Sequence, residues 1–254
     1  MSKIFFFDID GTLAVNGQIP QSNKEALAIL KSKGYKTFIC TGRAPFYAER
    51  LFGNLVDGII SCNGRYISYK GQKIYGKALT HQELTYFQNK INQLECGALF
   101  VSDDQSYIYH LNNKEIEMLK GEYGQERIHE TMTEVPFYTF DLFYQTLKQR
   151  DQLIETFHNN LIINDHGGSG SCDCSIIDFD KGNAIAYVLD YFSLSKEDAY
   201  AFGDGYNDQA MFREVAHSIA MGNAVQELKD KATYITSSVE KQGIMNALKY
   251  EKIV

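Results

Sequence analysis

The chain has 254 residues, and 25 lysines and arginines against 32 aspartates and glutamates give a formal net charge of −7. Hydrophobic residues make up 44% and charged residues 22%, and with 3 prolines and 20 glycines this composition excludes collagen-like and low-complexity chains. A negative charge without a block of basic residues argues against a dedicated nucleic-acid binder or a protein of anionic membrane surfaces.

Strand and helix patterns alternate over the first 62 residues. Residues 3–7 (KIFFF) are an unbroken apolar run, typical of a strand buried on both faces. Asp8 and Asp10 end this run far below the length of a membrane span, and we expect no targeting segment. The alternation predicts a parallel sheet with crossover helices. We expect strands at 3–7, 35–40 and 57–62 and helices at 21–33 and 44–52.

The pattern changes after residue 64. Residues 65–79 alternate around Lys70-Gly71 and predict a hairpin. Residues 80–179 then predict an α+β arrangement with adjacent strands, and their glycine-rich segment 167–171 is the most flexible-looking part of the chain. The elements expected there are helices at 80–94, 113–124 and 147–159 and strands within 98–110 and at 138–144, 161–164 and 174–178.

Strict alternation resumes after Gly182. We therefore predict an α/β fold: a Rossmann-like parallel-sheet core made of residues 1–79 and 180–254, interrupted by an inserted α+β domain, residues 80–179. The elements expected in the last segment are helices at 182–192, 207–215, 224–231 and 239–248 and strands at 199–203, 217–221 and 233–236.

Polar motifs stand at four expected strand or helix boundaries of the core. They are residues 8–12 (DIDGT), 41–43 (TGR), 180–182 (DKG) and 203–208 (GDGYND). Because ligands bind at the carboxyl ends of strands in open parallel sheets, we expect these motifs to meet at one edge.

The carboxylates at this edge predict a metal site that handles phosphate. Asp8, Asp10, Asp204 and Asp208 would repel one another unless a cation lies among them or some are protonated. Oxygen ligands favour Mg²⁺, and with Asp8 and Asp204 neutralised a phosphate dianion can approach. Lys181 would add a positive charge, and Thr41 with nearby backbone N–H groups would donate hydrogen bonds.

These residues also suit a two-step transfer of a phosphoryl group. A carboxylate can act as a nucleophile and form an aspartyl-phosphate, and Asp8 is the candidate because it closes the first strand. Asp10 can donate a proton to the leaving oxygen and later accept one from the attacking water. Gly11 allows the tight turn that directs both acids at one phosphorus atom.

Each motif has a structural interpretation when it is taken alone. Residues 8–12 fit a turn with a helix cap, and residues 203–208 fit an acidic calcium-like loop without the EF-hand spacing. Residues 71–78 nearly match a P-loop, but Ala78 lacks the required hydroxyl. His166, beside the glycine-rich segment, is a candidate substrate contact, and Cys172-x-Cys174 lacks the second ligand pair of a structural zinc site. All four motifs together, in this order, favour the catalytic interpretation.

The four motifs resemble those of the haloacid dehalogenase superfamily, and at the first motif the resemblance covers Phe7–Leu13. The pattern most resembles the Cof-type phosphatases, which carry an α+β cap between the second and third motifs. The resemblance implies that Asp8 is the nucleophile and a Mg²⁺ ligand, and that Asp10 is the acid/base, whose backbone carbonyl also meets the metal. It further implies that Thr41 and Lys181 bind the phosphoryl group and that Asp204 and Asp208 hold the metal. Gly42 and Asn207 are implied on the phosphate side, and Arg43 and Asn63 on the substrate side.

We therefore expect a cytoplasmic, Mg²⁺-dependent phosphatase that hydrolyses small phosphorylated metabolites, with sugar phosphates as the first candidates by resemblance. A phosphosugar mutase is an alternative, because an aspartyl-phosphate can return its phosphoryl group to a sugar hydroxyl. A receiver-like phospho-accepting signalling module also combines clustered Asp, a Thr and a Lys in a parallel α/β fold. We expect no nucleic-acid or membrane partner and a monomer or small homo-oligomer.

Overall fold

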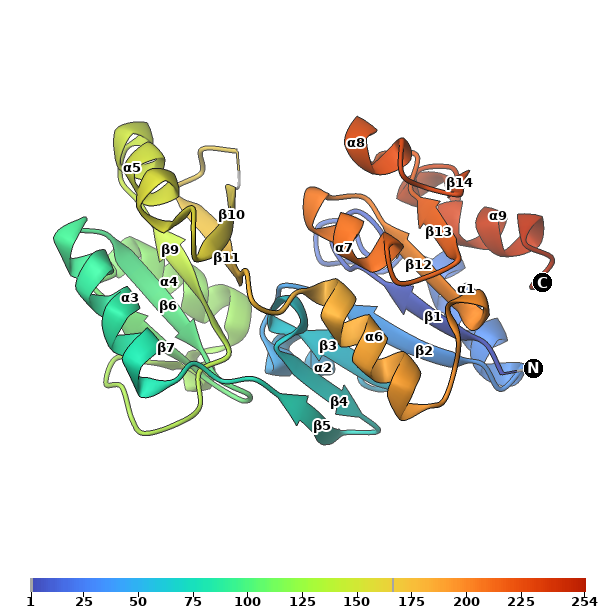
Figure 1. The fold of residues 1–254 in the computed structure, drawn as a ribbon, viewed down its shortest axis with the longest axis horizontal. Helices are drawn as coiled ribbons and strands as arrows, with labels where there is room; N and C mark the ends of the chain where they lie inside the picture. Colours follow the sequence, from blue (N-terminus) through green and yellow to red (C-terminus); the bar gives the residue numbers. More distant parts are fainter. Residues whose placement is uncertain (1, 166) are drawn as a thin grey trace.

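The computed structural model describes residues 2–165 and 167–254, and their strands form two sheets that lie side by side in Figure 1. The larger sheet has eight strands in the order β14-β13-β12-β1-β2-β3-β4-β5, and the smaller has six in the order β10-β11-β9-β6-β7-β8. His166, the candidate substrate contact, lies outside the described residues.

The larger sheet is parallel from β14 to β3, and β4 and β5 extend it as an antiparallel hairpin. Its central strand has Phe5 and Phe7 on one face and Ile4 and Phe6 on the other, and all four side chains are fully buried. The strands are β1 (Ile4–Phe7), β2 (Lys36–Cys40), β3 (Gly58–Ser61), β4 (Tyr66–Tyr69), β5 (Gln72–Gly76), β12 (Ala199–Gly203), β13 (His217–Ala220) and β14 (Tyr234–Ile235).

Helices cover both faces of this sheet, which confirms the predicted α/β core. The first face carries α1 (Gln21–Ser32), α2 (Pro45–Phe52) and α9 (Gly243–Tyr250). The second face carries α6 (Lys181–Tyr191), α7 (Gln209–Phe212) and α8 (Gln226–Lys229). Throughout the described part of the chain, no helix is both long enough and apolar enough to cross a bilayer.

The smaller sheet belongs to the inserted segment. Helices α3 and α5 pack on one face of it, and α4 packs on the other, where the apolar cluster also includes Ala44 and Tyr47 of the core. The elements are α3 (His81–Gln93), α4 (Asn113–Tyr123), α5 (Leu147–Phe157), β6 (Gly97–Val101), β7 (Ser106–Tyr109), β8 (Ile128–His129), β9 (Thr139–Phe143), β10 (Leu161–Asp165) and β11 (Ser171–Ile176).

One buried arginine joins the two connections between the sheets. Arg65 is 1% exposed, and its Nη1 lies 2.5 Å from Asp178 Oδ1 while its Nη2 donates to the Ala78 carbonyl at 3.4 Å. Lys77 also contacts Asp178, at 2.7 Å. The proposed domain boundaries, after residues 79 and 179, both fall in these connections.

Among the predicted elements that differ from the structure in extent, three are informative. The helix expected at 207–215 is a 3₁₀ turn at Tyr206–Asp208 followed by the short α7, because the Asp208 carboxylate binds the backbone N–H groups just before it. The helix expected at 239–248 is interrupted at Gln242, whose φ is 59°, before α9. The strand expected at 174–178 is β11 instead, which ends at Ile176 because its partner β10 begins at the paired Leu161.

Candidate active site

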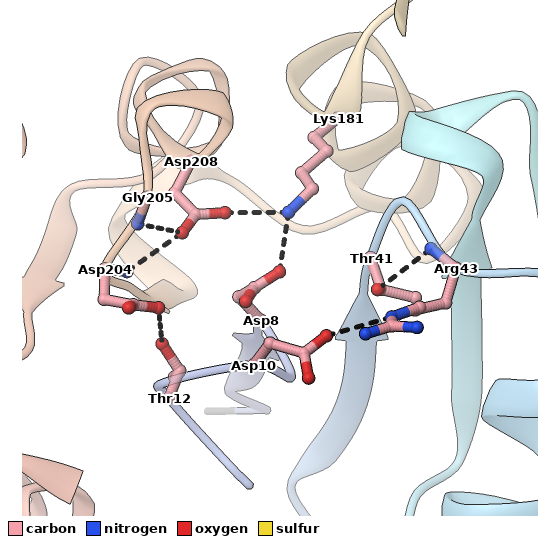
Figure 2. A network of polar contacts seen from close by, with 9 residues as sticks. All are labelled: Asp8, Asp10, Thr12, Thr41, Arg43, Lys181, Asp204, Gly205 and Asp208. Carbon is pink, nitrogen blue, oxygen red and sulfur yellow. Dashed lines mark hydrogen bonds and ion pairs between the residues drawn. The ribbon is translucent and has the colours of Figure 1, made fainter. Parts of the chain in front are cut away.

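The polar motifs meet where the strand order of the larger sheet reverses. From β1 the chain continues to β2 on one side, whereas β12 pairs with the other side of β1, with Phe7 opposite Phe202. Asp8 and Gly203-Asp204 therefore leave the sheet next to each other, and crevices at such switch points are where open α/β sheets bind ligands. Figure 2 shows the resulting network.

Lys181 bridges two carboxylates at the centre of the site. Its Nζ lies 2.7 Å from Asp8 Oδ1 and 2.7 Å from Asp208 Oδ1, and it is 1% exposed. Burial alone would lower the pKa of Lys181, but the charges of Asp208 and Asp8 outweigh burial and hold that pKa above its ordinary value. The lysine is therefore a permanent positive charge. It begins α6, where Gly182 allows close approach because a Cβ there would lie 2.5 Å from the Ala210 carbonyl oxygen.

Asp208 is fully buried, and both of its oxygens have partners. Oδ1 accepts from Lys181, and Oδ2 accepts from the backbone N–H groups of Asp204 and Gly205, each at 2.9 Å. These bonds fix the loop that follows β12. Asp208 therefore orients Lys181 and Asp204.

Asp204 is held against the first motif. Its Oδ1 accepts from Thr12 Oγ1 at 2.9 Å, and its Oδ2 accepts from Asn223 Nδ2 at 3.3 Å. Gly11, with a φ of +85°, packs directly on this carboxylate, because a Cβ at Gly11 would lie 2.1 Å from Asp204 Oδ2. Only glycine fits this position without moving Asp204.

The cluster carries more negative charge than Lys181 neutralises. Burial, and then the charge of Asp208, raise the pKa of Asp204 to about 6, and the same two causes raise the pKa of Asp8 well above its ordinary value. Oxygens of Asp8, Asp204 and Asp208 all lie within 4.8 Å of one another. An all-oxygen donor set with uncompensated charge fits a hard cation such as Mg²⁺.

Asp10 lies beside this cluster and faces solvent. Its side chain is 50% exposed, and Oδ2 accepts from Arg43 Nε at 3.1 Å. Arg43 also forms an ion pair with Glu122, at the end of α4. Thr41 is 2% exposed, and its Oγ1 accepts from the Arg43 N–H at 3.2 Å, which fixes the turn after β2.

The remaining candidates are Gly42, Asn63 and Asn207, and the first two lie beside Thr41. Asn63 has a left-handed φ of 52°, and its N–H donates to the Thr41 carbonyl at 3.0 Å. A Cβ on Gly42 would lie 3.0 Å from Asn63 Oδ1, a buried oxygen that has no hydrogen-bond partner among the described residues. Asn63, Lys181 and Asn207 line a cavity of about 190 Å³ together with Asn164 and Ser175 of the inserted segment.

The structure thus places the ten predicted site residues in and around the Asp8–Lys181 network. Asp10 and Arg43 line one cavity, and Asn63, Lys181 and Asn207 line another. Three further residues were not predicted. Thr12 could have been found, because it belongs to the first motif, whereas Asn223 stands in a turn after β13 that carries no recognisable pattern. Glu122 is separated from Arg43 by 79 residues, and nothing in the sequence joins them.

Known proteins are similar to this chain in sequence and in fold. A sequence profile of the haloacid dehalogenase-like hydrolases matches residues 5–248. The chain is 29% identical to the putative phosphatase YkrA of Bacillus subtilis, over 98% of this chain and 97% of that protein. It is 27% identical to the 5-amino-6-(5-phospho-D-ribitylamino)uracil phosphatase YwtE of the same species, over 95% of each chain. Its fold is similar to the subclass IIB sugar phosphatase BT4131, with a TM-score of 0.81, 27% identity and full coverage of both chains.

Proposed function

Because this chain belongs to the haloacid dehalogenase-like hydrolases, we propose that it is a Mg²⁺-dependent phosphatase that cleaves phosphomonoesters of small metabolites through an aspartyl-phosphate on Asp8. One observation carries the proposal: Lys181 joins Asp8 to Asp208 at 2.7 Å each, with Asp204 and Asp10 beside them. This arrangement combines a nucleophile, a fixed cation, a metal-ligand set and a proton donor around one position for phosphorus.

In the proposed first step, a carboxylate oxygen of Asp8 attacks phosphorus, and the bond between phosphorus and the leaving oxygen breaks. Lys181 fixes the Asp8 carboxylate through Oδ1 and offers positive charge to the phosphoryl oxygens. Thr41 and Asn207 stand on the phosphate side as hydrogen-bond donors. Asp10 gives its proton to the leaving oxygen, so the product departs as a neutral alcohol group.

In the second step, water attacks the phosphorus of the aspartyl-phosphate, and Asp10 accepts its proton. Phosphate leaves and the Asp8 carboxylate is restored, so Asp10 ends protonated and ready for the next substrate. Arg43 holds Asp10 through Oδ2, and both residues line the same cavity. Asp8 and Asp204 would hold Mg²⁺, with Asp208 orienting the site, and the bound ion would neutralise charge on the phosphoryl oxygens.

The relatives and the fold support the proposed substrate class. Proteins similar to this chain are named for phosphatase activity on a phosphorylated ribitylaminouracil, on sugars and on phosphoglycolate, all of them small molecules. The inserted segment, residues 80–179, would act as a cap that excludes water and selects the leaving group. Sugar phosphates remain the first substrates to assay, and a cytoplasmic location is part of the proposal.

The test is phosphate release from p-nitrophenyl phosphate with Mg²⁺. We expect Asp8→Asn to abolish release, whereas Asp190→Asn, a matched change at an exposed position of α6, should leave it unchanged. Substantial turnover by Asp8→Asn, or turnover that is insensitive to EDTA, would contradict the mechanism. Sugar phosphates converted to isomers without free phosphate would indicate a mutase, and a long-lived aspartyl-phosphate would indicate a signalling module.

A further inference from the structure

A cavity of about 690 Å³ opens beside Asp10, between the core and the inserted segment. Its walls come from the loop after β1, the start of α2, the end of α4 and residues 238–240. Asp10 can protonate the leaving oxygen only from within hydrogen-bond distance. Since Asp10 lines this cavity, the leaving group of the substrate must extend into it.

The charges on the cavity wall are mostly negative. Asp10, Glu122 and Glu240 are its acidic residues, and Arg43 is its one basic residue among those that the structure places on the wall. Glu240 is exposed and stands on the core side, whereas Glu122 reaches the cavity from the inserted segment. A group entering this space therefore meets carboxylates on both sides.

Arg43 cannot compensate for these acids, because its guanidinium is already engaged. Nε donates to Asp10, Nη1 pairs with Glu122, and the group lies 5.2 Å from the centre of the Tyr47 ring. A second anion would have to compete with these two carboxylates for the charge of the arginine. The site thus holds a cation that is neutralised before any substrate arrives.

Acidic residues also mark the face of the smaller sheet that carries α4. In β9 and β11, Phe140, Leu142, Cys172 and Cys174 point into the apolar cluster on the opposite face. Alternation therefore places Asp141 and Asp173 on the α4 face, where the two are paired in register. Burial raises the pKa of Tyr123, next to Glu122, and the charge of Asp141 raises it further, so this acidic face lies close to the end of α4.

We propose that Glu122 is a specificity-determining residue, because it holds Arg43 and so keeps the cavity negative. The enzyme then selects phosphomonoesters with a neutral or cationic leaving group. It rejects those whose leaving group carries a carboxylate or a second phosphate. This inference rests on the proposed function. Carboxylates that face an anionic group of the substrate disfavour its binding, and they discriminate in this way between substrates of similar shape.

The experiment compares three two-carbon substrates that differ in charge: 2-aminoethyl phosphate, 2-hydroxyethyl phosphate and phosphoglycolate. We expect kcat/KM of the wild-type enzyme for phosphoglycolate to be at least about tenfold lower than for 2-hydroxyethyl phosphate, because its carboxylate faces nearby like charges. Glu122→Gln frees Arg43 from one of its two carboxylates. We expect this variant to reduce the ratio of the two kcat/KM values about fivefold, through a lower KM for phosphoglycolate. Glu117→Gln, at an exposed position of the same helix, is the matched control and should leave the ratio unchanged.

The outcomes are distinct. Equal kcat/KM for the neutral and anionic substrates in the wild type, or an unchanged ratio in Glu122→Gln, overturns the proposal; a residue that only holds the cap in place would affect both substrates alike. If Glu122→Gln does not fold, Glu240→Gln replaces it in the experiment. This variant should reduce the ratio of kcat/KM for 2-hydroxyethyl phosphate to that for phosphoglycolate about twofold. If no substrate releases phosphate, p-nitrophenyl phosphate included, the proposed function fails and the selectivity with it.

Discussion

Replacing Lys181 by methionine tests the charge balance of the site most directly. The lysine is 1% exposed and contacts Asp8 and Asp208 at 2.7 Å each, so the variant leaves two carboxylates without the cation between them. Methionine has a similar length and packs well in apolar surroundings, so the loss of charge dominates the effect. We expect Lys181→Met to unfold far more easily than the wild type in the absence of metal.

The magnitude follows from the cost of an unpaired buried charge. Removing one partner of a buried ion pair costs about 3–5 kcal/mol. The cost has an upper limit, because a carboxyl group can take up a proton instead. With an ordinary pKa of about 3.9, neutralising one carboxylate costs about 5 kcal/mol at pH 7.5 and about 2 kcal/mol at pH 5.5. The native state then binds more protons than the unfolded state, so stability falls as the pH rises.

The assay is urea unfolding with EDTA at both pH values, with Lys24→Met, an exposed position of α1, as the control. We expect Lys181→Met to lose about 3–5 kcal/mol of unfolding free energy at pH 7.5 and no more than about 2 kcal/mol at pH 5.5. The control should remain within about 0.5 kcal/mol of the wild type. A loss below about 1 kcal/mol at pH 7.5, or an equal loss at both pH values, would refute the reasoning.

Gly11→Ala places a Cβ 2.1 Å from Asp204 Oδ2 at a φ of +85°. We therefore expect the Mg²⁺ affinity, measured by calorimetry, to fall at least about tenfold. An unchanged affinity would show that Asp204 can move freely. The pKa of Asp204 is about 6 without metal, so the metal-free protein loses stability as the pH rises from about 4 to 6. Mg²⁺ must displace the proton of Asp204 in order to bind. Thermal unfolding should therefore show a larger Mg²⁺-induced rise in Tm at pH 7.5 than at pH 5. Equal rises in Tm at the two pH values would contradict the raised pKa of Asp204. Arg65→Met should speed proteolysis of the connections near Ala78 and Asp178, and Arg150→Met is the control. Equal cleavage rates in Arg65→Met and the wild type would show that Arg65 does not hold the two connections together.

Most of the core was predictable because its residues carry local signals. An unbroken run such as residues 4–7 identifies a strand buried on both faces, and the motif at residues 8–12 gave the position of the nucleophile candidate. The interrupted helix at Gln242 was not predictable, because the chain turns there to bring Gly243 against Ser237, where a Cβ would lie 2.1 Å from the carbonyl oxygen. That constraint belongs to tertiary packing and leaves no local pattern.

The candidate site also has a part that the sequence predicted and a part that it did not. Residue types and strand ends predicted the cluster around Lys181, because parallel strands bring their carboxyl ends together. Arg43 was expected to line the substrate side, and the structure places it in the cavity beside Asp10, paired with Glu122. This pairing depends on how the inserted segment sits on the core, and neither helix periodicity nor motif spacing contains that information.

The place of β1 in the larger sheet also sets an order of events during synthesis. β1 pairs with β2 on one side and with β12, Ala199–Gly203, on the other, whereas the smaller sheet is built from a continuous stretch between Gly97 and Ile176. A ribosome therefore releases every strand of the smaller sheet before the segment that completes the larger one, and we expect the inserted segment to fold first. Asp8 is translated before the inserted segment, yet it meets Lys181 and Asp204 only after that segment has been made. A chain truncated before α6 thus carries the nucleophile candidate without Lys181 and Asp204, so the proposed catalysis requires a chain that extends past β12.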